Sequence, residues 1–115
     1  MNDDSRLADY LRQMIEGSRD AASFTDGMDR GAFLSDLRTQ RAVVMSLMIV
    51  GEAAARVLAD HSDFAEAHPD IPWRSICGMR NRIAHGYFDV DLGVVWQTVG
   101  TELPTLINRL EAMLD

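Results

Sequence analysis

Residues 37–59 read LRTQRAVVMSLMIVGEAAARVLA, and this stretch decides the fold that we predict for the chain. Its apolar residues lie at helical spacing but on more than one face, which is typical of a helix covered on several sides. Asp36 stands before it as a candidate N-cap. Gly51 sits inside it at a cost of about 1 kcal/mol relative to alanine, which indicates a close crossing by another helix.

Upstream, residues 5–24 carry apolar side chains at three- and four-residue intervals and predict a first helix, which Ser5 or Asp4 would cap. The sequence Thr25-Asp26-Gly27 is typical of a turn. Asp29 follows as the start of a short helical turn before the long helix.

Downstream, residues 61–70 are polar and predict an irregular loop, after which a third helix starts at Pro72. Gly86 is expected just past the end of that helix in a left-handed conformation. Asp89 is expected to cap a fourth helix, and Pro104 to kink it because proline lacks a backbone N–H. These patterns predict an all-α bundle of four principal helices with short connecting helical turns.

Size and composition indicate a single domain, residues 1–115, in a cytoplasmic protein. The one cysteine, Cys77, cannot form an internal disulfide, the acidic start does not resemble a secretion signal, and no apolar run approaches the roughly 18 residues that span a bilayer. The net charge of -7 argues against general affinity for nucleic acid. Residues 71–87, however, hold three arginines, one histidine and no acid, so they form a local positive island.

Within that island, residues 79–88 read MRNRIAHGYF, a cluster of polar side chains with no obvious structural role. A permanent cation, an imidazole that titrates near neutrality and a phenol suit attack on a phosphodiester. With RNA the neighbouring 2′-hydroxyl can serve as nucleophile, so no metal is required. The candidate catalytic residues are Arg80, Asn81, His85 and Tyr87.

On a straight helix Arg80 and His85 point about 140° apart. If the helix ends near His85 and Gly86 redirects the chain, Arg80, His85 and Tyr87 can surround one pocket. A two-fold dimer would add the second imidazole that acid and base catalysis needs, since the other histidines, His61 and His68, are interpreted as solvated loop residues.

A purely structural interpretation stays open at this point. Arg80 and Arg82 would then form surface ion pairs, and His85 would interact with the helix macrodipole. A metal site is not expected, because Asp89 and Asp91 are better explained as helix caps.

The string WRSICGMRNRIAHGYFDVDLGVVW, residues 73–96, resembles the HepT-like toxins of the HEPN superfamily. Their motif is an arginine, a polar residue, three variable positions, a histidine, one further position and a tyrosine. Arg80, Asn81, His85 and Tyr87 match it. The segment LMIVGEAAARVL, residues 47–58, resembles the Gly-Glu-Ala segment of the same family.

The resemblance implies an antiparallel HEPN-like bundle that forms a homodimer with a cleft between the two motif copies. It implies a metal-independent ribonuclease toxin without a cofactor, neutralised by a nucleotidyltransferase antitoxin that can AMPylate Tyr87. Arg82 and Arg74 are auxiliary candidates for binding the RNA backbone. Two alternatives remain: a non-catalytic nucleotide- or substrate-binding subunit of a two-protein nucleotidyltransferase, and a purely structural dimer.

One departure concerns the long helix. Many relatives carry Arg, Asn and Glu shortly before the Gly-Glu pair, whereas this chain has Met45, Ser46 and Met48. If those positions line the cleft, RNA selection or activity would be altered. We favour the alternative that the methionines fill the bundle core, which adaptable methionine side chains commonly do.

Overall fold

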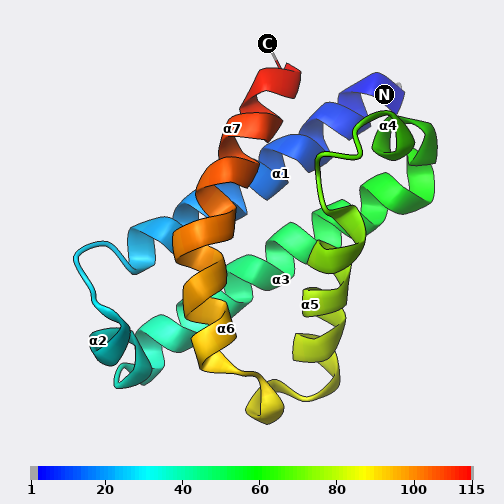
Figure 1. Cartoon of the computed structure of the whole chain (residues 1–115). Helices are drawn as coiled ribbons and strands as arrows, with labels where there is room; N and C mark the ends of the chain where they lie inside the picture. The colour runs from blue at the N-terminus through cyan, green and yellow to red at the C-terminus, as the bar shows by residue number, and fades with distance from the viewer. Residues whose placement is uncertain (1–2, 115) are drawn as a thin grey trace.

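The fold is a bundle of helices around one central helix (Figure 1). A computed structural model describes residues 3–114, and within that range the chain contains no β-strand. This confirms the predicted all-α class. The α-helices are α1 (Asp3–Phe24), α2 (Arg30–Leu34), α3 (Leu37–Asp60), α4 (Ser62–Ala67), α5 (Trp73–His85), α6 (Leu92–Gln97) and α7 (Leu103–Leu114). A 3-10 turn η1 (Tyr87–Asp89) and a π-helical turn η2 (Thr98–Glu102) connect the later helices.

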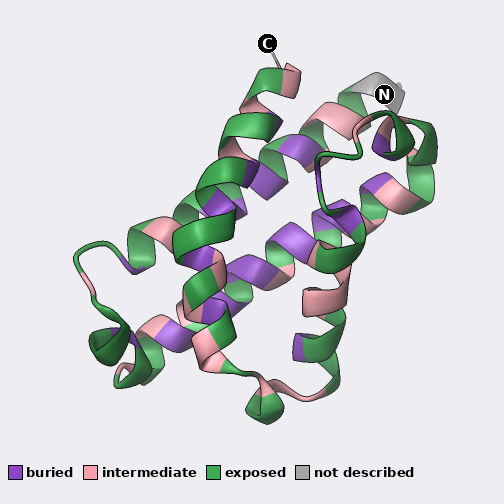
Figure 2. Cartoon of the chain, viewed as in Figure 1, coloured by how far each residue is buried: buried purple, intermediate pink, exposed green. Residues whose placement is uncertain are grey.

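The central helix is α3, as its apolar pattern predicts. It packs against α1 on one side and against α5 on the other, and α7 packs on α1. Figure 2 shows buried positions along most of α3. Ten residues of α3 are buried, among them Val43, Ala54 and Val57, which are fully enclosed. Because α1 and α5 cover only part of its circumference, α3 still has one exposed stripe, and this stripe borders the polar cluster on α5.

Two glycines allow the helices to approach α3 closely. A Cβ added to Gly51 would lie 2.3 Å from the Cβ of Arg80, so α5 crosses α3 at this point. The close crossing predicted at Gly51 is confirmed. Gly17 has the same role on α1, where an added Cβ would lie 2.8 Å from a methyl carbon of Val50. Alanine at residue 51 would push away the turn of α5 that carries Arg80.

The predicted caps of the middle helices are present. The Asp29 side chain accepts a hydrogen bond from the Ala32 N–H at 2.8 Å, and the Asp36 side chain accepts one from the Thr39 N–H at 3.1 Å. These bonds satisfy N–H groups that a helix start leaves without partners. They also lower the pKa of the Asp36 carboxyl, because the bonds from Thr39 favour its charged form. The described part of α1 begins at Asp3, so Ser5 lies inside the helix, and the side chain of Asp4, the other predicted cap, is outside the described residues.

Three local predictions in the second half of the chain are wrong. Residues 61–70 are not an irregular loop, because they contain α4, whose Phe64 ring packs against His68 with centroids 4.3 Å apart. Gly86 has φ −160°, an extended and not a left-handed conformation. The cap of α6 is Asp91 and not Asp89: its Oδ1 accepts hydrogen bonds from the N–H groups of residues 93 and 94 at 2.9 and 3.2 Å.

Pro104 disturbs the helical hydrogen bonding of the last long helical segment. The π-helical turn η2 occupies residues 98–102, immediately before the proline, and the Leu103 N–H bonds to the Thr98 carbonyl. A wider turn absorbs the break in the usual bonding ladder that proline causes. The predicted irregularity in the last long helix is therefore found as a π-helical turn between α6 and α7.

By length and hydropathy alone, α3 could also span a bilayer, with a mean hydropathy of 1.8 over its most apolar window. The sequence prediction considered only uninterrupted apolar runs, and on that criterion α3 was not identified as a candidate membrane span. Half of that window is buried inside the protein. A helix that is buried between α1 and α5 in the core of a bundle has the same apolar composition as a membrane span, so length and hydropathy alone do not distinguish the two.

Candidate active site

Arg80 is the most constrained member of the polar cluster. Its aliphatic stem packs on Gly51, and its Nη1 lies 3.7 Å from Oε2 of Glu52 on α3. The side chain is 26% exposed, and its Nε is buried without a hydrogen-bond partner among the described residues. Glu52 is shared with Arg56, whose Nε lies 3.7 Å from Oε1. The guanidinium is therefore held toward α3 by Glu52.

Asn81 and His85 lie four residues apart on α5 and share one exposed stripe of the helix. His85 is the last residue of α5, and the Gly86 N–H closes the helix on the Arg82 carbonyl at 3.1 Å. An exposed imidazole at this position can take a proton from a bound molecule or give one to it.

Tyr87 follows in η1 and turns back toward α3. Its ring lies beneath the guanidinium of Arg41, with Cζ 6.0 Å from the ring centroid. The Phe88 ring meets the Tyr87 ring edge-on, with centroids 5.4 Å apart and planes at 75°. Arg41 could not be predicted from the sequence as a neighbour of the motif, because it lies nearly forty residues upstream and carries no local signal. It becomes a neighbour of the motif only because α3 and α5 pack together.

The methionines of α3 also border the motif. Met45 is 61% exposed, and Met48 is half-buried. Both line a hollow together with Tyr87, whereas Ser46 is buried and donates to the Ala42 carbonyl at 3.0 Å. The expectation that the methionines fill the core is therefore wrong for Met45. Met45 therefore presents apolar surface near Tyr87.

A family model described as "Ribonuclease HepT-like" matches residues 14–113, which include the central helix and the complete motif. The chain belongs to the HepT-like ribonuclease family. The resemblance identified from the motif is thereby confirmed.

Relatives cover nearly all of this HepT-like chain. A protein of Thermococcus cleftensis named "Probable ribonuclease HepT" is 38% identical over 105 residues, which cover 91% of this chain and 93% of the relative. A protein of Methanocaldococcus jannaschii, provisionally named an RNase, is 30% identical over 91% of this chain and 84% of its own length. A similarly named protein of Caldanaerobacter subterraneus is 31% identical over 92% of each chain. No solved structure matches the chain.

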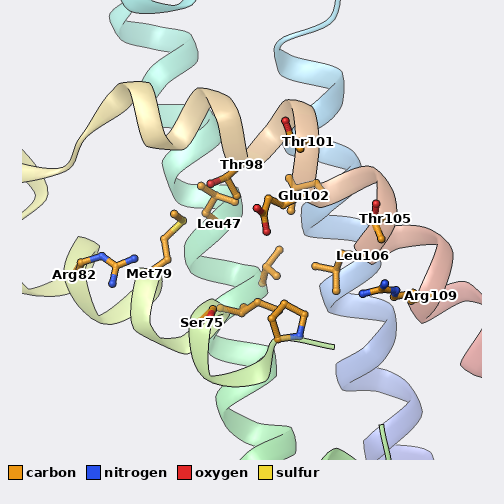
Figure 3. A pocket seen from close by; sticks show the side chains of 14 residues that line it. Leu47, Ser75, Met79, Arg82, Thr98, Thr101, Glu102, Thr105, Leu106 and Arg109 are labelled. Atoms are coloured by element: carbon orange, nitrogen blue, oxygen red, sulfur yellow. The ribbon is translucent and has the colours of Figure 1, made fainter. Parts of the chain in front are cut away.

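Arg82 lies on a different face of the HepT-like bundle from Asn81 and His85. It lines a cavity of about 510 Å³ between α5 and the segment formed by η2 and α7. In Figure 3 the Glu102 carboxylate points into this cavity, and Arg82 and Arg109 lie toward opposite ends of it. Arg109 is held there by the Asp70 carbonyl, to which its Nη1 donates at 2.5 Å. Arg82 is thus separated from the motif stripe, although it is next to Asn81 in sequence.

Arg74 is not brought near the motif within one chain. It is exposed in the first turn of α5, where it lines a hollow between α5 and α4. Eleven residues of helix separate it from His85, or about 16 Å at the usual helical rise. A strand of RNA that contacts both residues would have to run along α5.

The other two histidines, His61 and His68, pack against aromatic rings. His61 joins α3 to α4, its ring lies 6.1 Å from that of Tyr10, and its Nε2 is buried without a hydrogen-bond partner among the described residues. The His68 carbonyl accepts a hydrogen bond from the Trp73 indole at 3.1 Å. The interpretation of both as solvated loop residues is therefore wrong, since each packs against an aromatic ring.

Cys77 faces α3 one turn before Arg80. Its Sγ lies 4.0 Å from the Gly51 carbonyl, and burial raises the pKa of the thiol. Desolvation outweighs the nearby Arg80 cation, which acts in the opposite direction. The cysteine is therefore part of the helix crossing and is not an activated nucleophile. Within residues 3–114, no three His, Cys, Asp or Glu side chains gather in a group that could hold a metal ion.

Proposed function

We propose that this chain is an endoribonuclease that acts without a bound metal, as the toxin of a toxin–antitoxin pair. The observation that carries the proposal is the end of α5, where an exposed His85 closes the helix and Arg80 stands five residues earlier beside Glu52. These are the groups that phosphodiester cleavage requires: one that moves protons and one that carries a fixed positive charge. Membership of the HepT-like ribonuclease family supports the same reaction.

In the proposed reaction the 2′-hydroxyl of RNA attacks the adjacent phosphorus, and the bond from phosphorus to the 5′-oxygen breaks. One imidazole, that of His85, accepts the proton of the attacking hydroxyl, and a second imidazole donates a proton to the departing oxygen. Arg80 stabilises the negative charge that develops on the phosphoryl oxygens. Asn81, on the same stripe as His85, orients the substrate, and Tyr87 positions the phosphate.

The second imidazole comes from a homodimer in this proposal. Each chain supplies one His85 at an exposed helix end, and the remaining histidines pack against the aromatic rings of Tyr10 and Phe64. A two-fold axis that brings two copies of α5 together would place two such imidazoles in one cleft. Arg82 and Arg74 would then contact the RNA backbone outside that cleft, because each lies on a separate part of α5.

Control by a nucleotidyltransferase antitoxin is proposed at Tyr87. Transfer of AMP to the phenol oxygen would add a negatively charged phosphate and a bulky nucleoside close to Arg41. The added charge would repel RNA, and the added bulk would block the cleft. Mass spectrometry of the chain co-expressed with its antitoxin tests this, because an adduct must map to Tyr87 and must be absent from Tyr87→Phe.

The test of the nuclease is cleavage of defined RNA in the presence of a chelator. We expect cleavage by the parent and none by His85→Ala or Arg80→Ala. His68→Ala and Arg12→Ala are matched controls, since neither residue lies at the His85 end of α5 and neither change should affect the rate. Circular dichroism would verify that each variant is folded.

If the parent and His85→Ala cleaved RNA at equal rates, the His85 imidazole would have no part in the mechanism. A parent that binds nucleotide but cleaves no RNA would support the alternative, a non-catalytic binding subunit of a nucleotidyltransferase.

A further inference from the structure

A hollow beside Tyr87 has no assigned role in the reaction described above. It has a volume of about 470 Å³ and lies between α3 and the end of α5. Met45, Met48 and Ile83 form part of its wall, and Tyr87 and Phe88 border it at η1. Arg41 contributes the single charged side chain among the described residues that line it. The hollow is thus apolar, aromatic on one side and positively charged at one point.

Phe88 is unusual among the aromatic residues of the protein. It is 90% exposed, although it directly follows the half-buried Tyr87. The two rings meet at 75°, so Tyr87 touches Phe88 through an edge and does not cover it by stacking. Exposed aromatic faces of this kind are the platforms on which unpaired nucleobases stack.

The remaining lining suits the same ligand. Methionine side chains are polarisable and adapt to the outline of a flat ring. The Arg41 guanidinium, 6.0 Å from the centroid of Tyr87, is placed to hold a phosphate or to stack on a base. Among the residues that the structure describes, no acid lines the hollow to repel the backbone of a nucleic acid, although the chain as a whole carries a net charge of -7.

We propose that this hollow is a subsite for one unpaired base of the substrate RNA, stacked on Phe88, with the adjoining phosphate bound by Arg41. The inference rests on the proposed ribonuclease function and extends it to sequence selection. Met45 then determines specificity, since its exposed side chain forms an apolar wall. The RNA would be recognised as a single strand, because a base inside a duplex cannot reach Phe88.

The test uses an RNA analogue that the enzyme cannot cleave. A 2′-O-methyl oligoribonucleotide lacks the nucleophilic hydroxyl, and a single 2-aminopurine in it loses fluorescence when it stacks on an aromatic ring. We expect quenching by the parent and a Kd raised roughly 5- to 150-fold by Phe88→Ala, the range that corresponds to stacking of one base. Arg41→Gln should also weaken binding, with a smaller dependence on salt than the parent shows.

Phe24→Ala is the matched control. This residue is an exposed aromatic on α1, 46% accessible, and it does not line the hollow. Its replacement should leave both the quenching and the Kd unchanged. Because Phe88 is almost fully exposed, Phe88→Ala should fold like the parent, and a thermal melt would verify this.

The outcomes separate the subsite from the nuclease. If the parent cleaves RNA and Phe88→Ala binds and quenches the analogue equally well, the subsite is refuted and the ribonuclease stands. If quenching depends on Phe88 but the parent cleaves no RNA, the subsite stands and the ribonuclease fails. If sedimentation shows that Phe88→Ala dissociates a dimer formed by the parent, a second copy covers Phe88 and the subsite is refuted. A parent that does not bind the analogue also refutes it.

Discussion

Replacing Gly51 with alanine tests the packing that presents Arg80. The absence of a side chain at residue 51 lets α5 cross α3 there, with the Arg80 stem lying directly over the glycine. An added Cβ would lie 2.3 Å from the Cβ of Arg80 and 3.3 Å from the carbonyl oxygen of Ile76. Since carbon atoms pack at about 3.5 Å or more, the two helices must separate by about 1.2 Å.

The expected magnitude combines two opposing effects. Overpacking a tight contact costs about 1–3 kcal/mol, whereas alanine in place of a glycine inside a helix stabilises it by about 1 kcal/mol. The obstructing atom is a Cβ, which cannot rotate away, so the cost should be near the upper limit. We expect Gly51→Ala to lower the free energy of unfolding by about 2 kcal/mol. RNA cleavage should also fall, because Arg80 moves with α5.

Urea denaturation followed by circular dichroism would measure the change, at one fixed protein concentration. Gly100→Ala is the matched control: it lies in η2, and an added Cβ would meet nothing within 4 Å. We expect this control to equal or exceed the parent in stability. If Gly51→Ala were as stable as Gly100→Ala, the close crossing would not be the constraint that positions Arg80.

Three further predictions address single contacts. Glu52→Gln should reduce RNA cleavage about 10- to 100-fold by releasing Arg80, while the free energy of unfolding by urea changes by less than about 1 kcal/mol because the Glu52 carboxylate is exposed. Asp91→Ala should lower the free energy of unfolding by about 1 kcal/mol and Asp89→Ala by much less, since only the former caps α6; equal losses would contradict this. Alkylation of Cys77 should be slower than that of a free thiol at neutral pH and should accelerate as pH rises, because its pKa is raised; a rate equal to that of free cysteine would refute the burial.

The helices that rest on repeated apolar spacing could be predicted from the sequence. The central position of α3 follows from apolar residues on several of its faces, and its start follows from Asp36. The contact at Gly51 could also be predicted, because a glycine inside a strong helix has a cost that close packing explains. These features depend on signals a few residues apart, which a linear sequence displays directly.

The segments around the motif were harder to predict, because two local signals competed there. Asp89 and Asp91 are equally good caps by residue type, and the 3-10 turn η1 decides between them by occupying residues 87–89. Gly86 was expected to be left-handed, but the chain passes from α5 into η1 in an extended conformation. In both cases the geometry of the connection overrode residue preference.

The sequence by itself determined that the chain is helical, that α3 lies at its centre and that residues 80–87 carry the motif of the HepT-like family. The tertiary structure decided what that motif faces. It pairs Arg80 with Glu52, places Arg41 over Tyr87 and exposes Met45 beside them. These neighbours are distant in sequence, and only the packing of α5 across α3 brings them together. Apolar periodicity predicts that a helix is covered, but it does not specify which helix covers it or at which turn.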